Sequence, residues 1–414
     1  MPRRRGVASL LVAGLLIAAC GSDDDSADSD SASASASASE PASDSASASA
    51  SEPASDSASA SASASEPASD SASASEMADE AMASDSASAS ASEPSDDAAG
   101  DCEAGQRSFD HPFMTNGPLC IPETPERVVD LSTDALEVLV ATDDAPVGTQ
   151  SWATGIMGTN FPYLQPALEG IADLGFNPVN LEAVALAEPD LIISGDFMRE
   201  DIGAELEEIA TTVFFQSGGS GDWKEGLTFT GELLNRQEVV AERFAEYDAR
   251  VADLREAVGD PSAIDISVVR VLTDPGEVMM NLVASYPSAV LADVGFGRPE
   301  SQALSSEEAI EIYDGDIGGF ISIEEIELID ADHIFFWSQT PDAEQDAQAD
   351  EAFEEITGNA LFGTLDAIQN ENFTRVDGHW VGWGFHAAHA ILDDLFVNIA
   401  GVDPAEVSPN PFTS

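Results

Sequence analysis

The pattern of apolar and polar positions divides the chain into a long polar N-terminal segment and a C-terminal part with recurring apolar runs. From residue 101 onward, short continuous apolar runs alternate with stretches whose apolar positions are spaced three or four apart. Such runs predict buried strands, and this spacing predicts helices. The strand-like runs are 127–131, 145–148, 190–193, 212–215, 266–271 and 333–337. The alternation indicates an α/β fold with mostly parallel sheets.

About 310 residues follow position 100, a length that favours two lobes over one. A helical stripe of apolar residues separates the halves, and Gly259 and Pro261 end it. The stripe consists of Leu233, Val240, Phe244, Tyr247, Val251, Leu254 and Val258. We therefore expect an N-terminal lobe over 101–230, a connecting helix over 231–259 and a C-terminal lobe over 260–414.

Each half contains one copy of an internal repeat that begins with a glutamate in a short predicted helix. The separation is 142 residues, both from Glu182 to Glu324 and from Asp190 to Asp332. Each copy predicts a short helix, a turn and a buried strand. A glutamate in the first turn favours the helix dipole. Both glutamates could therefore be capping residues, or they could mark matched positions for docking to a symmetric partner.

The polar N-terminal segment begins with a secretion signal. Three arginines precede the apolar run Val7–Ala19, which at about 13 residues is shorter than the roughly 20 needed to span a bilayer. Residues 1–19 therefore read as a signal peptide, and the ending Leu16–Cys20 resembles a bacterial lipobox. We expect Cys20 to carry lipid as the only membrane attachment, outside the cytoplasmic membrane. Residues 20–100 are mainly Ser, Ala, Asp, Glu and Pro, a composition typical of a disordered linker.

Charge and cysteine usage narrow the class further. The chain has 78 acidic and 14 basic residues, and Lys224 is its single lysine. This balance is typical of proteins adapted to salt and excludes a basic surface for nucleic acid. With Cys20 lipidated, Cys102 and Cys120 form an even pair, which predicts a disulfide in an oxidising compartment.

The chain from about Cys102 to its end resembles the iron–siderophore substrate-binding lipoproteins of ABC importers. The resemblance rests on 125–131, 179–182, 188–193, 291–299 and 380–395, in that order along the chain. It implies two Rossmann-like lobes joined by a rigid helix, with no catalytic residue, resident metal or permanent cofactor. It also implies a monomer that carries a ferric siderophore to an ABC permease dimer, with Glu182 and Glu324 meeting arginines of the permease.

A bulky ferric chelate needs aromatic faces and a few cationic donors, which we expect at the ends of parallel strands. The candidate ligand-binding residues are Trp152, Trp223, Trp337, Trp380, Trp383, Tyr286, Arg270 and Arg298. For each tryptophan the alternative is core packing, and for Arg298 it is a structural salt bridge. The few arginines favour a neutral or hydroxamate chelate over a strongly anionic catecholate.

Other ligands and another class of protein stay open from the sequence. Haem or cobalamin could occupy the same fold. A bare metal would need convergent ligands, for which the five histidines are the candidates: His111, His333, His379, His386 and His389. A secreted α/β enzyme is the alternative of another class, although the chain lacks a Gly-x-Ser-x-Gly elbow and a phosphate-binding loop.

Overall fold

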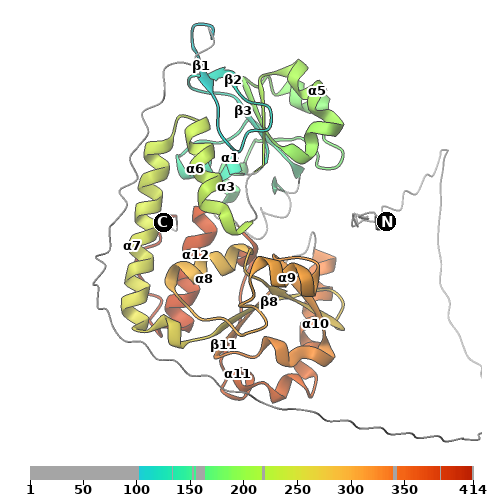
Figure 1. Cartoon of the computed structure of the whole chain (residues 1–414), viewed down its shortest axis with the longest axis vertical. Helices are drawn as coiled ribbons and strands as arrows, with labels where there is room; N and C mark the ends of the chain where they lie inside the picture. The colour runs from blue at the N-terminus through green and yellow to red at the C-terminus, as the bar shows by residue number, and fades with distance from the viewer. Residues whose placement is uncertain are drawn as a thin grey trace, which may run out of the picture. The chain divides into compact units, whose positions relative to one another are not determined.

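The computed structural model describes residues 102–412, except 133, 152, 155–163, 217–219, 339–342 and 383. The predicted signal peptide, the linker and Cys20 therefore lie outside the described residues and stay predictions. The described residues all belong to one compact unit, Ser90–Ser414. Within this unit the chain forms two α/β lobes (Figure 1), which confirms the predicted fold class.

The N-terminal lobe is built on a parallel five-stranded sheet of order β5-β4-β3-β6-β7. Its strands are β3 (Val128–Leu131), β4 (Gly148–Thr149), β5 (Ala172–Asp173), β6 (Leu191–Gly195) and β7 (Thr212–Phe215). Helices α1 (Asp134–Ala141), α3 (Gln165–Leu168), α4 (Leu181–Leu186) and α5 (Arg199–Ile209) connect them, with a 3-10 turn, η3, at Asp196–Met198. Strands β3, β6 and β7 are buried along their whole length, which explains their continuous apolar sequences.

The C-terminal lobe has a mixed five-stranded sheet of order β10-β9-β8-β11-β12. Its strands are β8 (Ile266–Val271), β9 (Glu277–Asn281), β10 (Gly318–Ser322), β11 (His333–Trp337) and β12 (Phe373–Arg375). β8, β11 and β12 are parallel, whereas β9 and β10 run antiparallel to their neighbours β8 and β9. The helices are α8 (Tyr286–Val294), α9 (Ser306–Tyr313), α10 (Ala343–Gly358), α11 (Asp366–Gln369) and α12 (Phe385–Asn398), and the 3-10 segment η6 spans Ile323–Ile329.

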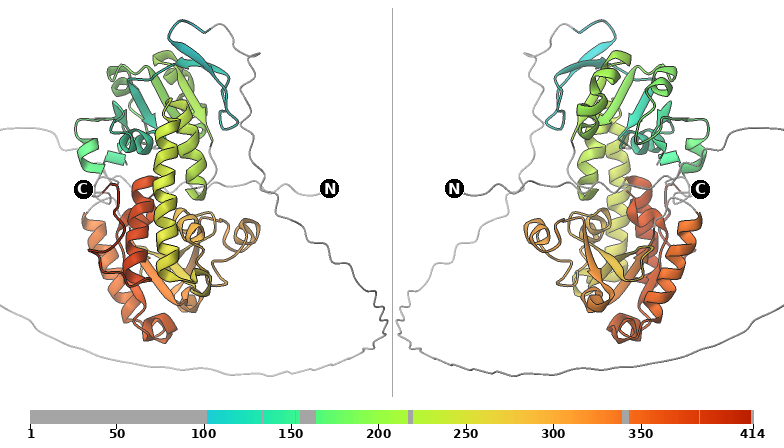
Figure 2. Two further views of the ribbon diagram at one scale, coloured as in Figure 1. Left: turned by 90° about the vertical axis from the view of Figure 1, so that its left-hand side faces the viewer. Right: turned by 90° about the vertical axis from the view of Figure 1, so that its right-hand side faces the viewer.

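Two helices lead from the first lobe to the second. α6 (Trp223–Leu233) ends just before Asn235, whose φ of 57° breaks the helical path, and α7 (Gln237–Val258) begins two residues later. The connecting helix thus starts after the predicted Gly231, which belongs to α6. α7 runs alongside both lobes (Figures 1 and 2) and ends at Gly259, whose φ is 88°.

One hydrophobic core passes through both lobes. It joins residues of the N-terminal sheet, such as Ile193, to α6, α7 and α12, and continues to Phe335 in the C-terminal sheet. Separate clusters cover the opposite face of each sheet, around Phe214 in the first lobe and Phe336 in the second. Because the shared core includes the connecting helices, the lobes are joined by packed side chains as well as by the backbone.

A small hairpin precedes the first lobe. β1 (Gln106–Phe109) pairs antiparallel with β2 (Leu119–Pro122), and a disulfide joins Cys102 to Cys120 beside it. Arg107 donates to the carbonyl oxygens of Glu232 and Leu233, at 2.6 and 2.9 Å, at the end of α6. The hairpin is therefore attached to the helical connection.

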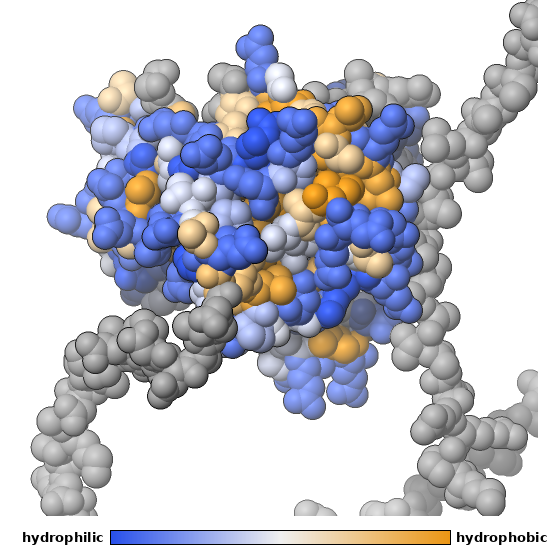
Figure 3. All heavy atoms as spheres, turned by 90° about the horizontal axis from the view of Figure 1, so that it is seen from above, coloured by the Kyte–Doolittle hydropathy of each residue, from blue (hydrophilic) through white to orange (hydrophobic). Residues whose placement is uncertain are grey.

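The acidic side chains lie mostly at the surface. α5, for example, exposes Glu200, Asp201, Glu205, Glu207 and Glu208. The face seen from above is largely hydrophilic, with an apolar area toward one side (Figure 3). The acidity is therefore a property of the surface and leaves the apolar core unchanged.

Candidate functional site

A pocket lies at the carboxyl edge of the N-terminal sheet. The turns after β3, β6 and β7 enclose a cavity of about 360 Å³, called here the N-lobe pocket. Its lining residues are Ser132, Asp134, Gly195, Asp196, Phe197, Phe215 and Gln216. Soon after β7, Gly221 N donates to Ala284 O of the C-terminal lobe at 2.9 Å. The pocket thus lies at the edge of the sheet that is nearest to this contact with the other lobe. In α/β proteins, ligands bind at this carboxyl edge of the sheet.

Asp130 fixes the turn that forms one wall of the N-lobe pocket. Its buried carboxylate accepts from the backbone N and Oγ of Ser132, both at 2.8 Å, and from Leu136 N at 2.9 Å. Three donors stabilise a buried carboxylate and cap the first turn of α1. This arrangement holds Ser132 and Asp134 at the pocket.

Asp134 has an unusual electrostatic environment. Burial, together with the negative charges of Asp130 and Glu137, raises the pKa of Asp134 to about 7. Both causes disfavour the charged form of a carboxyl group. Asp134 therefore exchanges a proton near neutral pH, at the wall of a cavity.

Arg270 and Trp337 lie at the carboxyl ends of the neighbouring parallel strands β8 and β11. The Arg270 guanidinium carbon lies 5.1 Å from the centre of the Trp337 ring, and Trp337 Nε1 donates to Asn281 Oδ1 at 2.9 Å. Burial lowers the pKa of Arg270. The ring of Trp337 is buried, whereas Arg270 keeps part of its surface exposed. A ligand role for either residue stays a prediction, and Arg270 is the more accessible of the two.

Arg298 is held by side chains and backbone of its own lobe. It donates to Ser288 Oγ, to Gln302 Oε1 and, at 2.8 Å, to the carbonyl oxygen of Asn281. Burial lowers its pKa to about 10. These bonds engage both terminal nitrogens within the lobe, and Nε is buried without a hydrogen-bond partner among the described residues. A ligand role for Arg298 therefore remains a prediction.

The remaining aromatic candidates belong to the core. Trp223 packs against Tyr286 with ring centres 5.6 Å apart, and Tyr286 Oη donates to Gly384 O at 2.6 Å. Trp380 stacks on Phe335 at 4.5 Å. All three candidates are almost fully buried, as core packing requires, and their ligand role stays a prediction. Trp152 and Trp383 lie outside the described residues.

The histidines take part in separate contacts. Their partners are Glu137 for His386 (2.9 Å), Arg250 for His389 (2.9 Å), Asp394 for His379 (2.7 Å) and Thr374 for His333 (2.9 Å). Burial lowers the pKa of His333 to about 4, and burial next to Arg250 lowers that of His389 to about 3. Within the described part of the chain, no group of three His, Cys, Asp or Glu side chains could hold a metal ion.

Glu182 and Glu324 occupy matching places in the two lobes. Each element begins at the carboxyl edge of its sheet: Asn180 N donates to Leu174 O, just past β5, and Ile323 N donates to Gly276 O, after β8. Both glutamates are exposed, and neither makes a hydrogen bond or ion pair with another described residue. Asn180 Oδ1 caps α4 by accepting from Ala183 N, and Glu325 takes the capping role in η6. The two glutamates are therefore not needed as caps.

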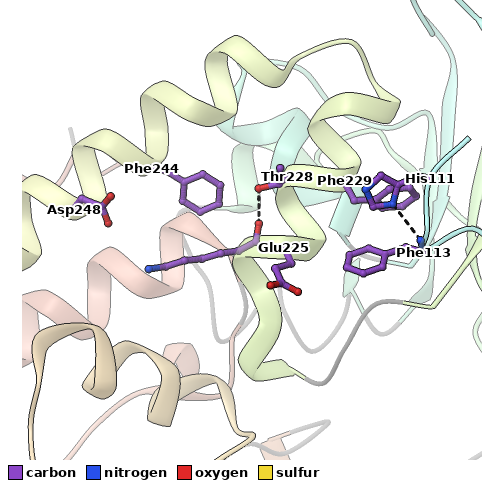
Figure 4. A pocket seen from close by; sticks show the side chains of 8 residues that line it. His111, Phe113, Glu225, Thr228, Phe229, Phe244 and Asp248 are labelled. Atoms are coloured by element: carbon purple, nitrogen blue, oxygen red, sulfur yellow. Dashed lines mark hydrogen bonds between the residues drawn. The ribbon is translucent and has the colours of Figure 1, made fainter. Parts of the chain in front are cut away.

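A second cavity, of about 370 Å³, lies beside the connecting helices (Figure 4). Phe244 and Asp248 of α7 face Thr228 and Phe229 of α6, and His111 and Phe113 close one end. Lys224 also lines it, but its ammonium group is bound to Asp293 at 2.7 Å. His111 Nδ1 accepts from Phe113 N at 3.1 Å. Four of the eight lining side chains are aromatic, and the Lys224 ammonium is already paired with Asp293.

The sequence reasoning missed the residues of the N-lobe pocket. A usable signal was present, because Ser132 and Asp134 follow the strand-like run 127–131 and Asp196 follows the run 190–193. Polar residues after parallel strands gather at one sheet edge. The predicted site residues are mainly tryptophans and arginines, of which Trp223, Trp337 and Trp380 are buried in the core.

Comparison with known proteins places the chain in a family. Residues 128–378 match the periplasmic binding protein family. The chain is 33% identical over 286 residues to the probable siderophore-binding lipoprotein YfiY of Bacillus subtilis, with 66% of this chain and 82% of that protein covered. Its fold resembles Staphylococcus aureus SirA complexed with staphyloferrin B, with a TM-score of 0.57 and 25% identity over 69% of this chain and 96% of that one.

The chain therefore belongs to the periplasmic binding protein family, whose members bind substrates for transport and are not enzymes. This confirms the family resemblance and removes the enzyme alternative. Over a shorter stretch of 155 residues, the chain is 30% identical to a cobalamin-binding protein of Halobacterium salinarum. This stretch covers 36% of this chain and 40% of that protein. Among the described residues, no helix is long and apolar enough to cross a membrane.

Proposed function

We propose that the protein captures a ferric siderophore between its two lobes and delivers it to an ABC importer, without a permanent cofactor. The observation that carries this proposal is the 33% identity to a probable siderophore-binding lipoprotein, which extends over 82% of that relative. The N-lobe pocket supports it, because a cavity at the carboxyl edge of a parallel sheet is a common place for a ligand in an α/β protein.

The matched glutamates would orient the loaded protein on a permease dimer. Glu182 and Glu324 are exposed, free of capping duty and placed at the same sheet edge in each lobe. Two carboxylates in equivalent positions suit two equivalent arginine sites, and such charge-assisted contacts give both orientation and affinity. A monomer presents one such pair, so one binding protein would serve one permease dimer.

The N-terminal segment would keep the protein near its permease. Lipid on Cys20 would anchor the chain to the outer face of the cytoplasmic membrane. The acidic linker over 20–100 would extend, since its charges repel one another and few of its residues can form a core. This arrangement lets the ligand-binding lobes search for cargo while remaining tethered.

Tryptophan fluorescence of the purified full-length protein tests the ligand assignment. Three of the five tryptophans are buried in the shared core or beside Arg270, so a ligand that draws the lobes together should change their emission. Saturable quenching by ferric siderophores, and none by free ferric iron or haem, is the expected result. A panel of hydroxamate, catecholate and carboxylate chelates that leaves the emission unchanged would contradict the proposal.

Cobalamin is a second candidate ligand, supported by the partial identity to the Halobacterium salinarum protein. It is also bulky and would need a largely aromatic or apolar site. The same titration includes cobalamin, and binding tighter than that of every ferric chelate would replace the siderophore assignment.

A further inference from the structure

The N-lobe pocket contains acceptors of positive charge, and the described residues that line it include no cation. Its polar lining consists of two carboxylates, a hydroxyl and an amide, from Asp134, Asp196, Ser132 and Gln216. Lys, Arg and His are all absent from the residues recorded in its lining. Phe197 leaves 72% of its surface exposed at the rim. An aromatic face beside carboxylates is suited to an organic cation.

The two carboxylates differ in how far their charge is compensated. Asp196 accepts from Thr115 Oγ1, and Arg199 Nη1 lies 3.9 Å from its Oδ1. Asp134, by contrast, receives no hydrogen bond and forms no ion pair within the described part of the chain. The charge that lacks a protein partner in this pocket is therefore that of Asp134.

Neighbouring groups cannot supply this partner. Asp130 and Glu137 repel the Asp134 carboxylate, and the side chain of His386, brought in by α12, is bound to Glu137 at 2.9 Å. The residue of α6 next to the Asp134 carboxylate is Gly226, because a Cβ added to it would lie 3.8 Å from the carboxylate atoms. Glycine has no side chain that could pair with the carboxylate. The two residues before that glycine, Lys224 and Glu225, line the second cavity, and Lys224 is bound to Asp293.

We propose that the N-lobe pocket binds a primary ammonium group carried by the ferric chelate, with Asp134 as its counter-ion. The ammonium would donate to the Asp134 carboxylate and to the side-chain oxygens of Ser132 and Gln216, while Phe197 and Phe215 flank its alkyl stem. The proposal rests on the proposed function and narrows the cargo to ferric chelates with a cationic arm.

A dependence on pH follows from the state of Asp134. Its raised pKa of about 7 means that the carboxyl group is partly protonated at neutral pH. A bound cation favours the charged form and lowers this pKa, so binding should release a proton. Affinity for the ammonium-bearing chelate should therefore rise between about pH 6 and pH 8, whereas affinity for a chelate without the cation should not.

The test compares two probes that differ in this charge and by one small acetyl group. Ferrioxamine B is a linear ferric trihydroxamate that ends in a primary ammonium, and its N-acetylated form is neutral at that end. Both are titrated into the full-length protein at pH 6, 7 and 8 by isothermal calorimetry in two buffers of different ionisation enthalpy. We expect the ammonium form to bind at least about tenfold tighter at pH 8, where Asp134 is mostly charged, and the preference to shrink at pH 6. Proton release on binding should be clear at pH 6 and 7, where the free carboxyl group is partly protonated, and small at pH 8.

Variants assign the preference to Asp134. In Asp134→Asn the ratio of the two affinities should fall to within about twofold and the proton release should disappear. Asp134→Glu should retain part of the preference. Asp201→Asn, an exposed charge on α5 of the same lobe, removes one negative charge outside the pocket and should leave the ratio unchanged.

The outcomes separate this inference from the proposed function. Equal binding of the two probes by the native protein, or selective binding of a catecholate or citrate chelate, overturns the inference and leaves the siderophore assignment intact. Failure of every ferric chelate to bind overturns both. If Asp134→Asn does not fold, the native protein still tests the inference. The ratio of its affinities for the two probes and its proton release are both measured without the variant.

Discussion

The two lobes have the same relative order of strands in their sheets but differ in strand direction and in the charge at their strand ends. The N-terminal sheet is entirely parallel, and its carboxyl edge contains Asp134 and Asp196 around a cavity. In the C-terminal sheet one strand, β9, runs antiparallel to both of its neighbours, and the parallel strands β8 and β11 end at Arg270 and Trp337. A repeated scaffold therefore presents carboxylates on one lobe and a guanidinium on the other.

This comparison shows which features are the same in both lobes and which differ between them. The exposed glutamates and the buried strand that follows each of them occur in both lobes, as a symmetric partner would require. The groups at the strand ends have no such symmetry, which suits the proposed chelate because a metal centre with an arm is itself asymmetric. We infer that the features repeated in both lobes bind the permease, and that the different groups at the strand ends bind the transported ligand.

The symmetric feature is tested by reversing both docking charges. Glu182→Arg with Glu324→Arg should reduce siderophore uptake by cells about tenfold or more, while chelate affinity of the purified protein stays within about twofold. Each single reversal should give an intermediate loss. The control reverses Glu205 and Glu354, one exposed glutamate on each lobe. Normal uptake by the double variant would show that the likeness of the lobes has no docking role.

The junction between the lobes is tested at Gly384. Its φ is 103°, and a Cβ there would lie 2.5 Å from the carboxyl atoms of Glu137, which is bound to His386 of α12. Gly384→Ala should therefore lower the free energy of unfolding by about 2–4 kcal/mol, measured by chemical denaturation.

The matched control for that variant is Gly401→Ala. Gly401 also has a positive φ, of 66°, but no atom lies within 4 Å of its added Cβ. It should cost about 1 kcal/mol from backbone conformation alone. Equal losses in both variants would mean that the contact between Glu137 and Gly384 contributes little to holding the lobes together.

The acidic edge is tested through the pH dependence of stability. The folded protein raises the pKa of Asp134 from 3.8 to about 7, so the folded state binds more protons in this range and loses stability as pH rises through it. Asp134→Asn should remove this loss. We expect it to be more stable than the native protein by about 1–2 kcal/mol at pH 8, a value discounted for solvent screening, and by almost nothing near pH 4.

Thermal denaturation of the two proteins across this pH range, with Asp201→Asn as control, gives the measurement. A difference that does not change with pH would show that Asp134 titrates normally, and would weaken the contrast between the lobes.

The cationic edge is tested by Arg270→Met, which keeps the stem and removes the charge. If this residue meets the anionic oxygens of the chelate, the affinity for ferric siderophore should fall about five- to tenfold, with a weaker dependence on salt. Arg375→Met is the control, because Arg375 ends β12 and is paired with Asp350 at the surface. Equal affinities of the native protein and Arg270→Met would assign Arg270 to packing against Trp337.

Local pattern was enough to predict most of the architecture. Buried parallel strands have continuous apolar sequences, so 190–193 and 333–337 predicted the strands that became β6 and β11. The start of the connecting helix could not be placed, because the break depends on the positive φ of Asn235, and an apolar stripe continues across it. The pairing of β9 and β10 also escaped prediction, because strand direction depends on contacts distant in sequence.

The amino-acid sequence by itself determined the α/β class, the two lobes, the repeat with Glu182 and Glu324, and the acidic surface. These are properties of composition and local periodicity, so neighbouring residues suffice to reveal them. Only the tertiary structure decided that Trp223, Trp337 and Trp380 are buried and that Asp134 lies at a cavity where no described residue serves as its counter-ion. A side chain's surroundings come from segments far apart in the chain, and burial and charge at a site are sums over those surroundings.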